Sequence, residues 1–175
     1  GSFLQNPTDI NVDSQGNIYV IGSFVSYEGK SYRMHVFNSD GSIKKRLITH
    51  NGNGNAYFNP ICGTAYTSNP KFDIHDDKIY YLDSGYRTAL NIIDLNGNCI
   101  RMKVLEHERY GSYMTRWETI EVTDNYIYLG TGNCSFYCYT ANENYRDGQK
   151  AAGAIMILKR SDLSKVRTIG GQGSY

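Results

Sequence analysis

Residues 10–20, Ile-Asn-Val-Asp-Ser-Gln-Gly-Asn-Ile-Tyr-Val, are the stretch that decides the fold of this chain. Two apolar runs flank a polar segment that contains Asp, Gly and Asn, which is typical of two strands joined by a turn. The same phrase returns at residues 72–82 (FDIHDDKIYYL) and at residues 120–129 (IEVTDNYIYL). Each copy has an Ile-Tyr step inside its second apolar run, as expected for a buried strand.

A second phrase follows each copy of the first. It reads MHVFNSDGSI at residues 34–43, LNIIDLNGNCI at residues 90–100 and IMILKRSDLSKV at residues 155–166. The first two contain Asp-Gly and Asn-Gly, which are strong signals for tight hairpin turns, and the third has a longer polar turn. Each unit is therefore predicted to hold four antiparallel strands. Successive units begin about 48 to 62 residues apart.

Four-stranded units at such a period are typical of β-propeller blades. We predict an all-β fold of three four-stranded antiparallel blades in a single propeller segment, residues 1–175, with blades at about 1–53, 54–108 and 109–175. The composition agrees, because the chain has 16 tyrosines and Tyr favours strands. A β-sandwich of about twelve strands is the alternative; it accounts for the strands but not for the repeated pair of phrases.

The sequence also resembles a known family. Residues 3–20 are similar to the start of an NHL-type propeller blade, and residues 169–175 are similar to the Gly-rich link into the next blade. The resemblance covers the strands of all three units and departs at the long insertions and at the third hairpin turn. It implies a six-bladed type of propeller, a scaffold that hosts binding proteins, assembly scaffolds and some lyases and hydrolases. Similar propellers occur in phage tail receptor-binding proteins and in bacterial surface proteins.

Three blades are fewer than the four to eight of a closed propeller. They would leave two apolar sheet faces uncovered, which native proteins avoid. The repeat has the same phase at residues 1–3 (GSF), 111–113 (GSY) and 173–175 (GSY). Either a second copy of the chain or additional blades from a longer chain is expected to complete the ring, and both alternatives stay open.

Strand order predicts where a ligand would bind. The turns within each phrase are short, whereas the long segments, 24–32, 49–69, 106–116 and 132–152, all connect strands at the opposite end of the blades. Long connections in a compact domain are usually functional or disordered. These contain many Tyr and Asn residues, a composition found in recognition surfaces.

We therefore predict a non-enzymatic binding module that recognises a glycan or a protein, such as a surface or phage-tail receptor-binding adhesin. Tyrosine rings can stack on sugar faces, while Asn, Arg and His can bind hydroxyl groups. The alternative role for these aromatic side chains is to pack the long connections onto the blades. The predicted ligand-binding residues are Asn55, Tyr57, His107, Tyr110, Tyr113, Arg116, Tyr137, Tyr139, Asn144, Tyr145 and Arg146.

Two other classes of function remain as alternatives. One is a lyase or hydrolase with a pocket at the propeller axis, served by His50, His107, Arg116 or Glu118, and the other is an assembly scaffold. No G-x-S-x-G, H-E-x-x-H or phosphate-loop motif is present. Residues 75–77 (HDD) and 13–17 (DSQGN) are interpreted as turns rather than as a catalytic or calcium site, and we expect no cofactor and no metal.

Charge and cysteine content narrow the class of partner. The 18 basic and 17 acidic residues form no cluster that suggests nucleic acid, and no apolar run is long enough for a membrane helix. We expect a protein outside the cell, at the cell surface or on a virion. The cysteines are Cys62, Cys99, Cys134 and Cys138, which could form two disulfides, a metal site or plain thiols. We interpret Cys99 as a small packed hydrophobic side chain, and a disulfide that involves the 134–138 loop is an alternative.

Overall fold

The computed structural model describes residues 5–26, 29–50, 70–83, 89–105, 109–110, 113–114, 117–131 and 154–170. These residues form strands, turns and bends, with no helix among them. The predicted all-β class is therefore confirmed.

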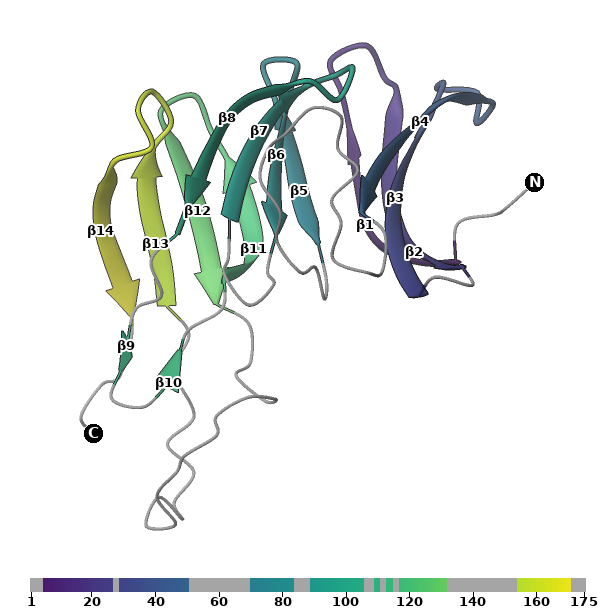
Figure 1. The fold of residues 1–175 in the computed structure, drawn as a ribbon. Helices are drawn as coiled ribbons and strands as arrows, with labels where there is room; N and C mark the ends of the chain where they lie inside the picture. The colour runs from purple at the N-terminus through teal and green to yellow at the C-terminus, as the bar shows by residue number, and fades with distance from the viewer. Residues whose placement is uncertain are drawn as a thin grey trace.

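Three antiparallel sheets of four strands make up the described structure (Figure 1). The first holds β1 (Gln5–Val12), β2 (Ile18–Ser26), β3 (Gly29–Phe37) and β4 (Ile43–His50). The second holds β5 (Lys71–His75), β6 (Lys78–Asp83), β7 (Ala89–Asp94) and β8 (Cys99–Val104). The third holds β11 (Trp117–Val122), β12 (Tyr126–Thr131), β13 (Ala154–Lys159) and β14 (Lys165–Gly170). A two-stranded hairpin, β9 (Arg109–Tyr110) with β10 (Tyr113–Met114), lies between the second and third sheets in the sequence.

The sheets are arranged as blades. Strands pair in sequence order within each sheet, and the first strand of one sheet contacts the first strand of the next, β1 with β5 and β5 with β11. In Figure 1 the three sheets stand side by side in a row. The predicted series of four-stranded blades is thus confirmed.

Side-chain alternation along the strands explains this arrangement. In the second sheet, Ile79 and Tyr81 pack in a core with the first sheet, whereas Tyr80 and Leu82 pack in a core with the third. Successive side chains of a strand point to opposite faces, so an unbroken apolar run fits only a sheet that is covered on both sides. The repeated Ile-Tyr step follows this rule, with Ile facing the preceding sheet and Tyr facing the following one.

Three turns share one hydrogen-bonded design. In the turns Asp13–Asn17, Asn38–Ser42 and Asp94–Asn98, the backbone N–H of the first residue donates to the carbonyl of the fifth, and the fourth residue, a glycine, donates back to the carbonyl of the first. The glycines have φ between 81° and 89°, a left-handed conformation that side chains with a Cβ rarely adopt. The design occurs in both phrases of the repeat, since Asp13–Asn17 lies in the first phrase and the other two turns lie in the second.

Asp13 holds its turn together from the inside. One carboxylate oxygen of Asp13 accepts the backbone N–H groups of Gln15 at 3.0 Å and Asn17 at 2.8 Å. The other accepts the Asn17 side-chain amide at 2.7 Å and the Tyr19 hydroxyl at 3.3 Å. Asp94 makes the equivalent bonds to Asn96 and Asn98. The carboxylate of Asp13 is thus bonded to protein N–H and O–H donors, which supports the interpretation of residues 13–17 as a turn.

The third sheet closes its last hairpin differently. The β13–β14 turn is longer, and its Leu163 has φ 61°, an unusual value for a residue other than glycine. Leu163 is buried in the core between the second and third sheets, so packing of its side chain compensates for the backbone strain. This explains why the third unit lacks the Asp-Gly or Asn-Gly signal.

One predicted loop is instead strand. The sequence interpretation placed a long connection at residues 24–32, but β2 continues to Ser26 and β3 begins at Gly29. The register pairs Phe24 with Ser31 and Ser23 with Tyr32. The hydrogen-bonded ladder of the hairpin therefore extends through polar residues that break the apolar pattern, and the first sheet has no long connection between β2 and β3.

Replacement of Asp13 by Ala is expected to lower the free energy of unfolding by about 2 kcal/mol, because it leaves buried donors of Asn17 and Tyr19 without an acceptor. Urea unfolding at neutral pH measures this change. Gln15→Ala, in the same turn with an exposed side chain, is the control and should change stability by less than about 0.5 kcal/mol.

The turn aspartates also predict a pH dependence. Burial raises the pKa of Asp13, but hydrogen bonds from Asn17, Gln15 and Tyr19 outweigh this effect, so the pKa lies below 3.8; the same balance lowers the pKa of Asp94. A carboxyl whose pKa is lower in the folded state stabilises the protein above its unfolded pKa, and this stabilisation disappears as the pH falls through the folded value. The melting temperature should therefore fall below about pH 4. It should fall less steeply in Asp13→Ala, and equal slopes would contradict this assignment.

Candidate functional site

The two ends of the sheets differ in how their strands are connected. The six turns β1–β2, β3–β4, β5–β6, β7–β8, β11–β12 and β13–β14 lie at one end, the upper end in Figure 1, and all are short. The connections 51–69, 84–88 and 132–153 start and finish at the other end, as does the segment that contains the β9–β10 hairpin. We call these the turn end and the connection end.

Most of the predicted ligand-binding residues belong to the connection end and lie outside the described residues. They are Asn55, Tyr57, His107, Arg116, Tyr137, Tyr139, Asn144, Tyr145 and Arg146. The backbones of Tyr110 and Tyr113 are described, and the two residues are direct register partners in the β9–β10 hairpin. The structure therefore brings this one predicted pair together, and the contribution of each predicted residue to binding stays a prediction.

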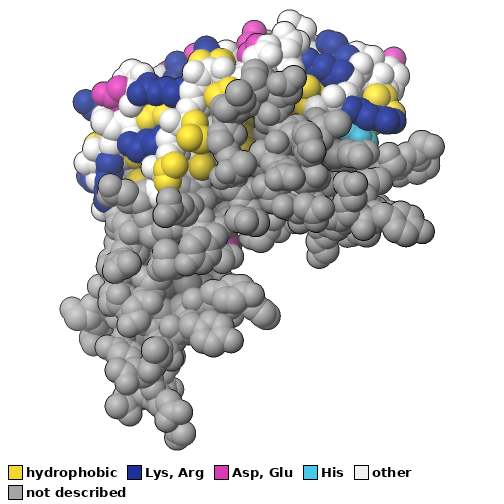
Figure 2. Space-filling view, viewed as in Figure 1, with side chains coloured by type: hydrophobic (Ala, Val, Ile, Leu, Met, Phe, Trp, Pro, Cys, Tyr) yellow, Lys and Arg dark blue, Asp and Glu magenta, His cyan; other side chains and the backbone are white. Residues whose placement is uncertain are grey.

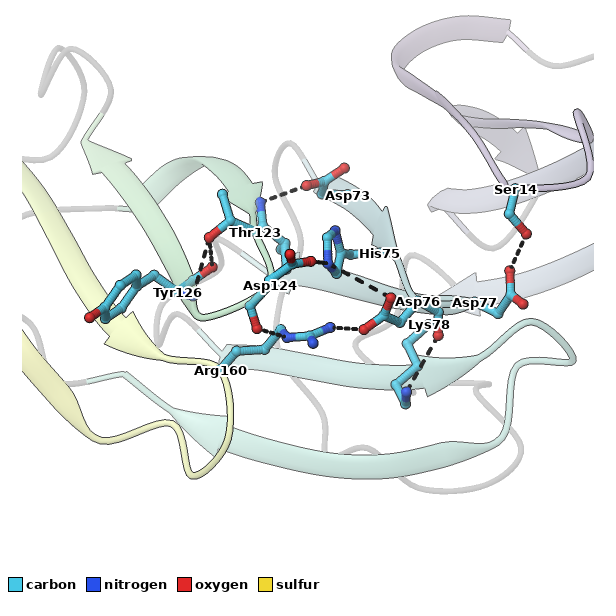
Figure 3. Close-up of polar contacts among 11 residues, drawn as sticks. Ser14, Asp73, His75, Asp76, Asp77, Lys78, Thr123, Asp124, Tyr126 and Arg160 are labelled. Carbon is cyan, nitrogen blue, oxygen red and sulfur yellow. Dashed lines mark hydrogen bonds and ion pairs between the residues drawn. The ribbon is translucent and has the colours of Figure 1, made fainter.

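A polar cluster at the turn end joins the second and third sheets (Figure 3). The Nε2 atom of His75 lies 2.9 Å from a carboxylate oxygen of Asp124 and 3.9 Å from one of Asp76. The guanidinium of Arg160 donates to the carboxylate of Asp76, and its Nε donates to the backbone carbonyl of Asp124 at 2.8 Å. Two sheets thus share one network of four side chains.

Electrostatics favours the ionised forms of Asp76 and Arg160 in this cluster. The hydrogen bond from Arg160 holds the pKa of Asp76 below its ordinary value, and the same bond raises the pKa of Arg160. Asp76 and Asp77 both have positive φ, 48° and 52°, as a two-residue hairpin turn requires. This backbone conformation presents Asp76 to the third sheet and Asp77 to the first, where the Ser14 hydroxyl donates to Asp77 at 2.8 Å.

The cluster lacks the arrangement of a nucleophilic enzyme. Among the described residues, no serine, threonine or cysteine is hydrogen-bonded to His75, as a nucleophile–base pair would require. No group of three His, Cys, Asp or Glu side chains in this part of the chain could hold a metal ion. The sequence interpretation expected a solvated turn at residues 75–77. The structure retains the turn and adds inter-sheet ties that the sequence did not reveal.

Further ties join the innermost strands. The Asn11 amide donates to one oxygen of Asp73 at 2.8 Å, and the backbone N–H of Val122 donates to the other at 2.6 Å. Asp9 accepts the backbone N–H of Phe72 at 2.9 Å. Asp73 therefore connects β1, β5 and β11 across all three sheets.

Cys99 forms a disulfide. It also packs against the core between the first and second sheets. The predicted packed position is thus correct, and the disulfide answers a question that the sequence left open. The other three cysteines, Cys62, Cys134 and Cys138, lie outside the described residues. The strand pattern around Cys99 carried no signal for cross-linking, because pairing depends on distant parts of the chain.

Comparisons with known proteins add little to the site. No protein-family model matches the sequence, and no curated protein matches it. A solved structure of a protein of unknown function from Bacteroides caccae is similar, with 8% sequence identity, a TM-score of 0.40 and coverage of 93% of this chain. The chain spans 60% of the length of that protein. Within the described residues, no helix is long and apolar enough to cross a membrane.

Replacement of Arg160 by Ala should lower the melting temperature by roughly 2–4 °C, because the third sheet loses its bonds to Asp76 and to the Asp124 carbonyl. Differential scanning calorimetry measures the shift. Lys159→Ala removes a neighbouring exposed cation and should leave the melting temperature unchanged within about 1 °C. Equal effects of the two variants would contradict the role of Arg160 as an inter-sheet tie.

Proposed function

We propose that this chain is a binding module of the NHL propeller type, without enzymatic activity, and that its connection end recognises a glycan or a protein receptor. The observation that carries the proposal is the separation of the two ends. All six short turns of the three sheets lie at one end, so the strands that the long connections join end at the other. A rigid scaffold that presents its variable segments on one side is a common design for recognition.

The chemistry of the connection end supports a glycan most directly. Its sequence contains tyrosines, asparagines and arginines, among them Tyr137, Tyr139, Asn144, Tyr145 and Arg146. Aromatic rings stack on the apolar faces of sugars, and amide and guanidinium groups bind sugar hydroxyls. The paired strands of Tyr110 and Tyr113 add a short hairpin at the same end.

The turn end has a different character. Its polar side chains are used in bonds between the sheets, such as those of Asp76 with Arg160 and of His75 with Asp124. Groups that already hold the scaffold together are poorly suited to rearrange around a ligand. This contrast supports the assignment of recognition to the connection end.

The disulfide at Cys99 supports a location outside the reducing cytosol. Disulfides persist in oxidising environments, which include the outside of cells and the surfaces of virions. An adhesin at the cell surface or on a virion, as the propeller resemblance suggests, would function there.

The binding proposal is tested on a glycan array, with hits measured by calorimetry. Tyr137→Ala, Tyr145→Ala and Asn144→Ala should each weaken the association constant by at least about tenfold, since aromatic and polar contacts at the centre of a site contribute most of the affinity. Asn125→Ala is the matched control, because Asn125 is an exposed residue at the turn end. If glycans bind with affinities that none of the first three changes alter, the proposed site is wrong. If no glycan binds, a protein receptor is the remaining form of the proposal.

The disulfide gives a separate prediction. In unreduced protein, peptide mapping should recover the peptide with Cys99 joined to a second cysteine-containing peptide. Cys99→Ser should lower the free energy of unfolding by about 2–4 kcal/mol, and a reducing agent should destabilise the parent protein but not the variant. Alkylation of Cys99 in unreduced, denatured protein would contradict the assignment.

A further inference from the structure

The first and third sheets each have one face that no described element covers. These faces are equivalent, by register, to faces that are buried inside the molecule. Ile10 of β1 is 63% exposed, whereas Phe72 at the same position of β5 is 2% exposed. Ile155 of β13 is 44% exposed, whereas Leu90 at the same position of β7 is fully buried. We call these the first-sheet face and the third-sheet face.

The two faces are of opposite kinds. Inside the molecule, Tyr19, Met34 and Val36 of the first sheet pack on Ile79, Tyr81 and Ile93 of the second. The equivalents of these first-sheet residues on the third-sheet face are Tyr128, Ile155 and Ile157. The equivalents of these second-sheet residues on the first-sheet face are Ile18, Val20 and Phe37. The third-sheet face therefore resembles the side of a sheet that packs on the next sheet along the chain. The first-sheet face resembles the side that packs on the sheet before it.

A repeated polar tie has the same direction. Lys45 on β4 donates to the backbone carbonyl of Leu95 and, at 3.3 Å, to the side-chain oxygen of Asn96 in the β7–β8 turn. Arg101 on β8 donates to the carbonyls of Ser161 and Asp162 in the β13–β14 turn, at 3.2 and 2.8 Å. A cation on the last strand of the first sheet, and another on that of the second, thus reach the last turn of the following sheet.

The third sheet carries the same cation. Arg167 on β14 pairs in register with Ile157, as Lys45 pairs with Val36 and Arg101 with Ile92. Arg167 is exposed, and no sheet among the described residues covers this face of the third sheet. In the first sheet, the turn equivalent to the one that accepts from Lys45 is Asn38–Ser42. The exposed Asp40 occupies the position of Asn96 in this turn. A cation on one open face is thus matched by an anion on the other.

The innermost strands repeat this match. Asp73 of β5 accepts the backbone N–H of Val122 on the next sheet. Glu121 of β11 holds the same register position, opposite Tyr128, as Asp73 holds opposite Tyr80. Glu121 is exposed, and the residue equivalent to Val122 on the first-sheet face is Val12, which is 51% exposed. The Glu121 carboxylate thus lies on the third-sheet face, and Val12, the equivalent of the residue that donates to Asp73, lies on the first-sheet face.

We propose that the third-sheet face binds the first-sheet face of a second copy of this chain, and that two copies close on each other through two such interfaces. The described residues of two copies hold six four-stranded sheets, a number within the four to eight blades of closed propellers. The interface places Arg167 of each copy on the Asp40 turn of the other.

Light scattering after size-exclusion chromatography tests the stoichiometry. The expected mass is about twice 19.8 kDa, with no larger species at high protein concentration, because the ring closes. A mass of 19.8 kDa at all soluble concentrations would overturn the proposal and would favour further blades in a longer chain as the cover for these faces. A ladder of larger assemblies would equally contradict a closed pair.

A charged residue in the apolar interface tests its position. Ile155→Glu should weaken association by roughly a hundredfold or more, because it buries a carboxylate without a partner at both interfaces. Ile100→Glu is the matched control, since Ile100 is also exposed but lies on β8, away from both open faces. Circular dichroism should show that both variants keep the β fold. A dimer that tolerates Ile155→Glu as well as Ile100→Glu would overturn the assigned surface.

Charge exchange tests the pairing of the two faces. Arg167→Glu and Asp40→Arg should each weaken association by at least about tenfold, and the double variant should restore most of the loss, since it recreates each pair with reversed signs. Lys165→Glu, on β14 at a position paired with the oppositely facing Leu158, should have little effect. Additive losses in the double variant would overturn the pairing of Arg167 with the Asp40 turn.

Discussion

The burial of each blade on both faces is the constraint on which the rest of the structure depends. Side chains alternate along a strand, so the second sheet can bury Ile79 and Tyr81 only against one neighbour and Tyr80 and Leu82 only against the other. A one-residue slip of register would exchange the two sets and leave each against the wrong partner. The apolar runs therefore determine the order of the sheets and the direction in which the series proceeds.

Polar groups complete what the apolar faces begin. Apolar packing is not directional, whereas a hydrogen bond requires a donor and an acceptor at a definite distance and angle. The bonds of Asp73 to β1 and β11, and those of Lys45 and Arg101 to the turns of following sheets, connect each blade to the next at its inner and outer strands. Hydrogen bonds of this kind each contribute only modestly to stability. Their repetition at equivalent positions indicates that their main role is to keep neighbouring blades in register.

On the face shown in Figure 2, hydrophobic side chains lie among Lys and Arg side chains over β8, whose exposed apolar residues are Ile100, Met102 and Val104.

The sequence predicted the part of the fold that is encoded locally. The paired phrases identified the strands of all three sheets and the short turns at one end, because strand alternation and turn chemistry depend on neighbouring residues. It missed the extension of β2 and β3 through residues 24–32, because polar residues there break the apolar pattern. The disulfide of Cys99 and the ties of His75 and Asp73 between sheets were missed because they depend on distant residues. It also missed the common design of the Asp13 and Asp94 turns, although both read Asp-x-x-Gly-Asn and the pattern was visible. Of the predicted ligand-binding residues, only Tyr110 and Tyr113 can be followed in the structure, as a backbone pair.

The burial of the sheets on both faces also limits where a ligand could bind. Sheets that are covered on both faces cannot present a ligand surface on those faces, so only the ends of the strands remain for recognition. At the turn end, short turns such as the one at Asp76 and Asp77 allow side chains to reach the adjacent sheet, and these contacts stiffen the row of blades. Connections that start and finish at the other end can differ in length without a change to the strands themselves. The proposed function thus assigns recognition to the connection end and stability to the turn end, and the proposed cover over the first-sheet and third-sheet faces would leave the connection end free.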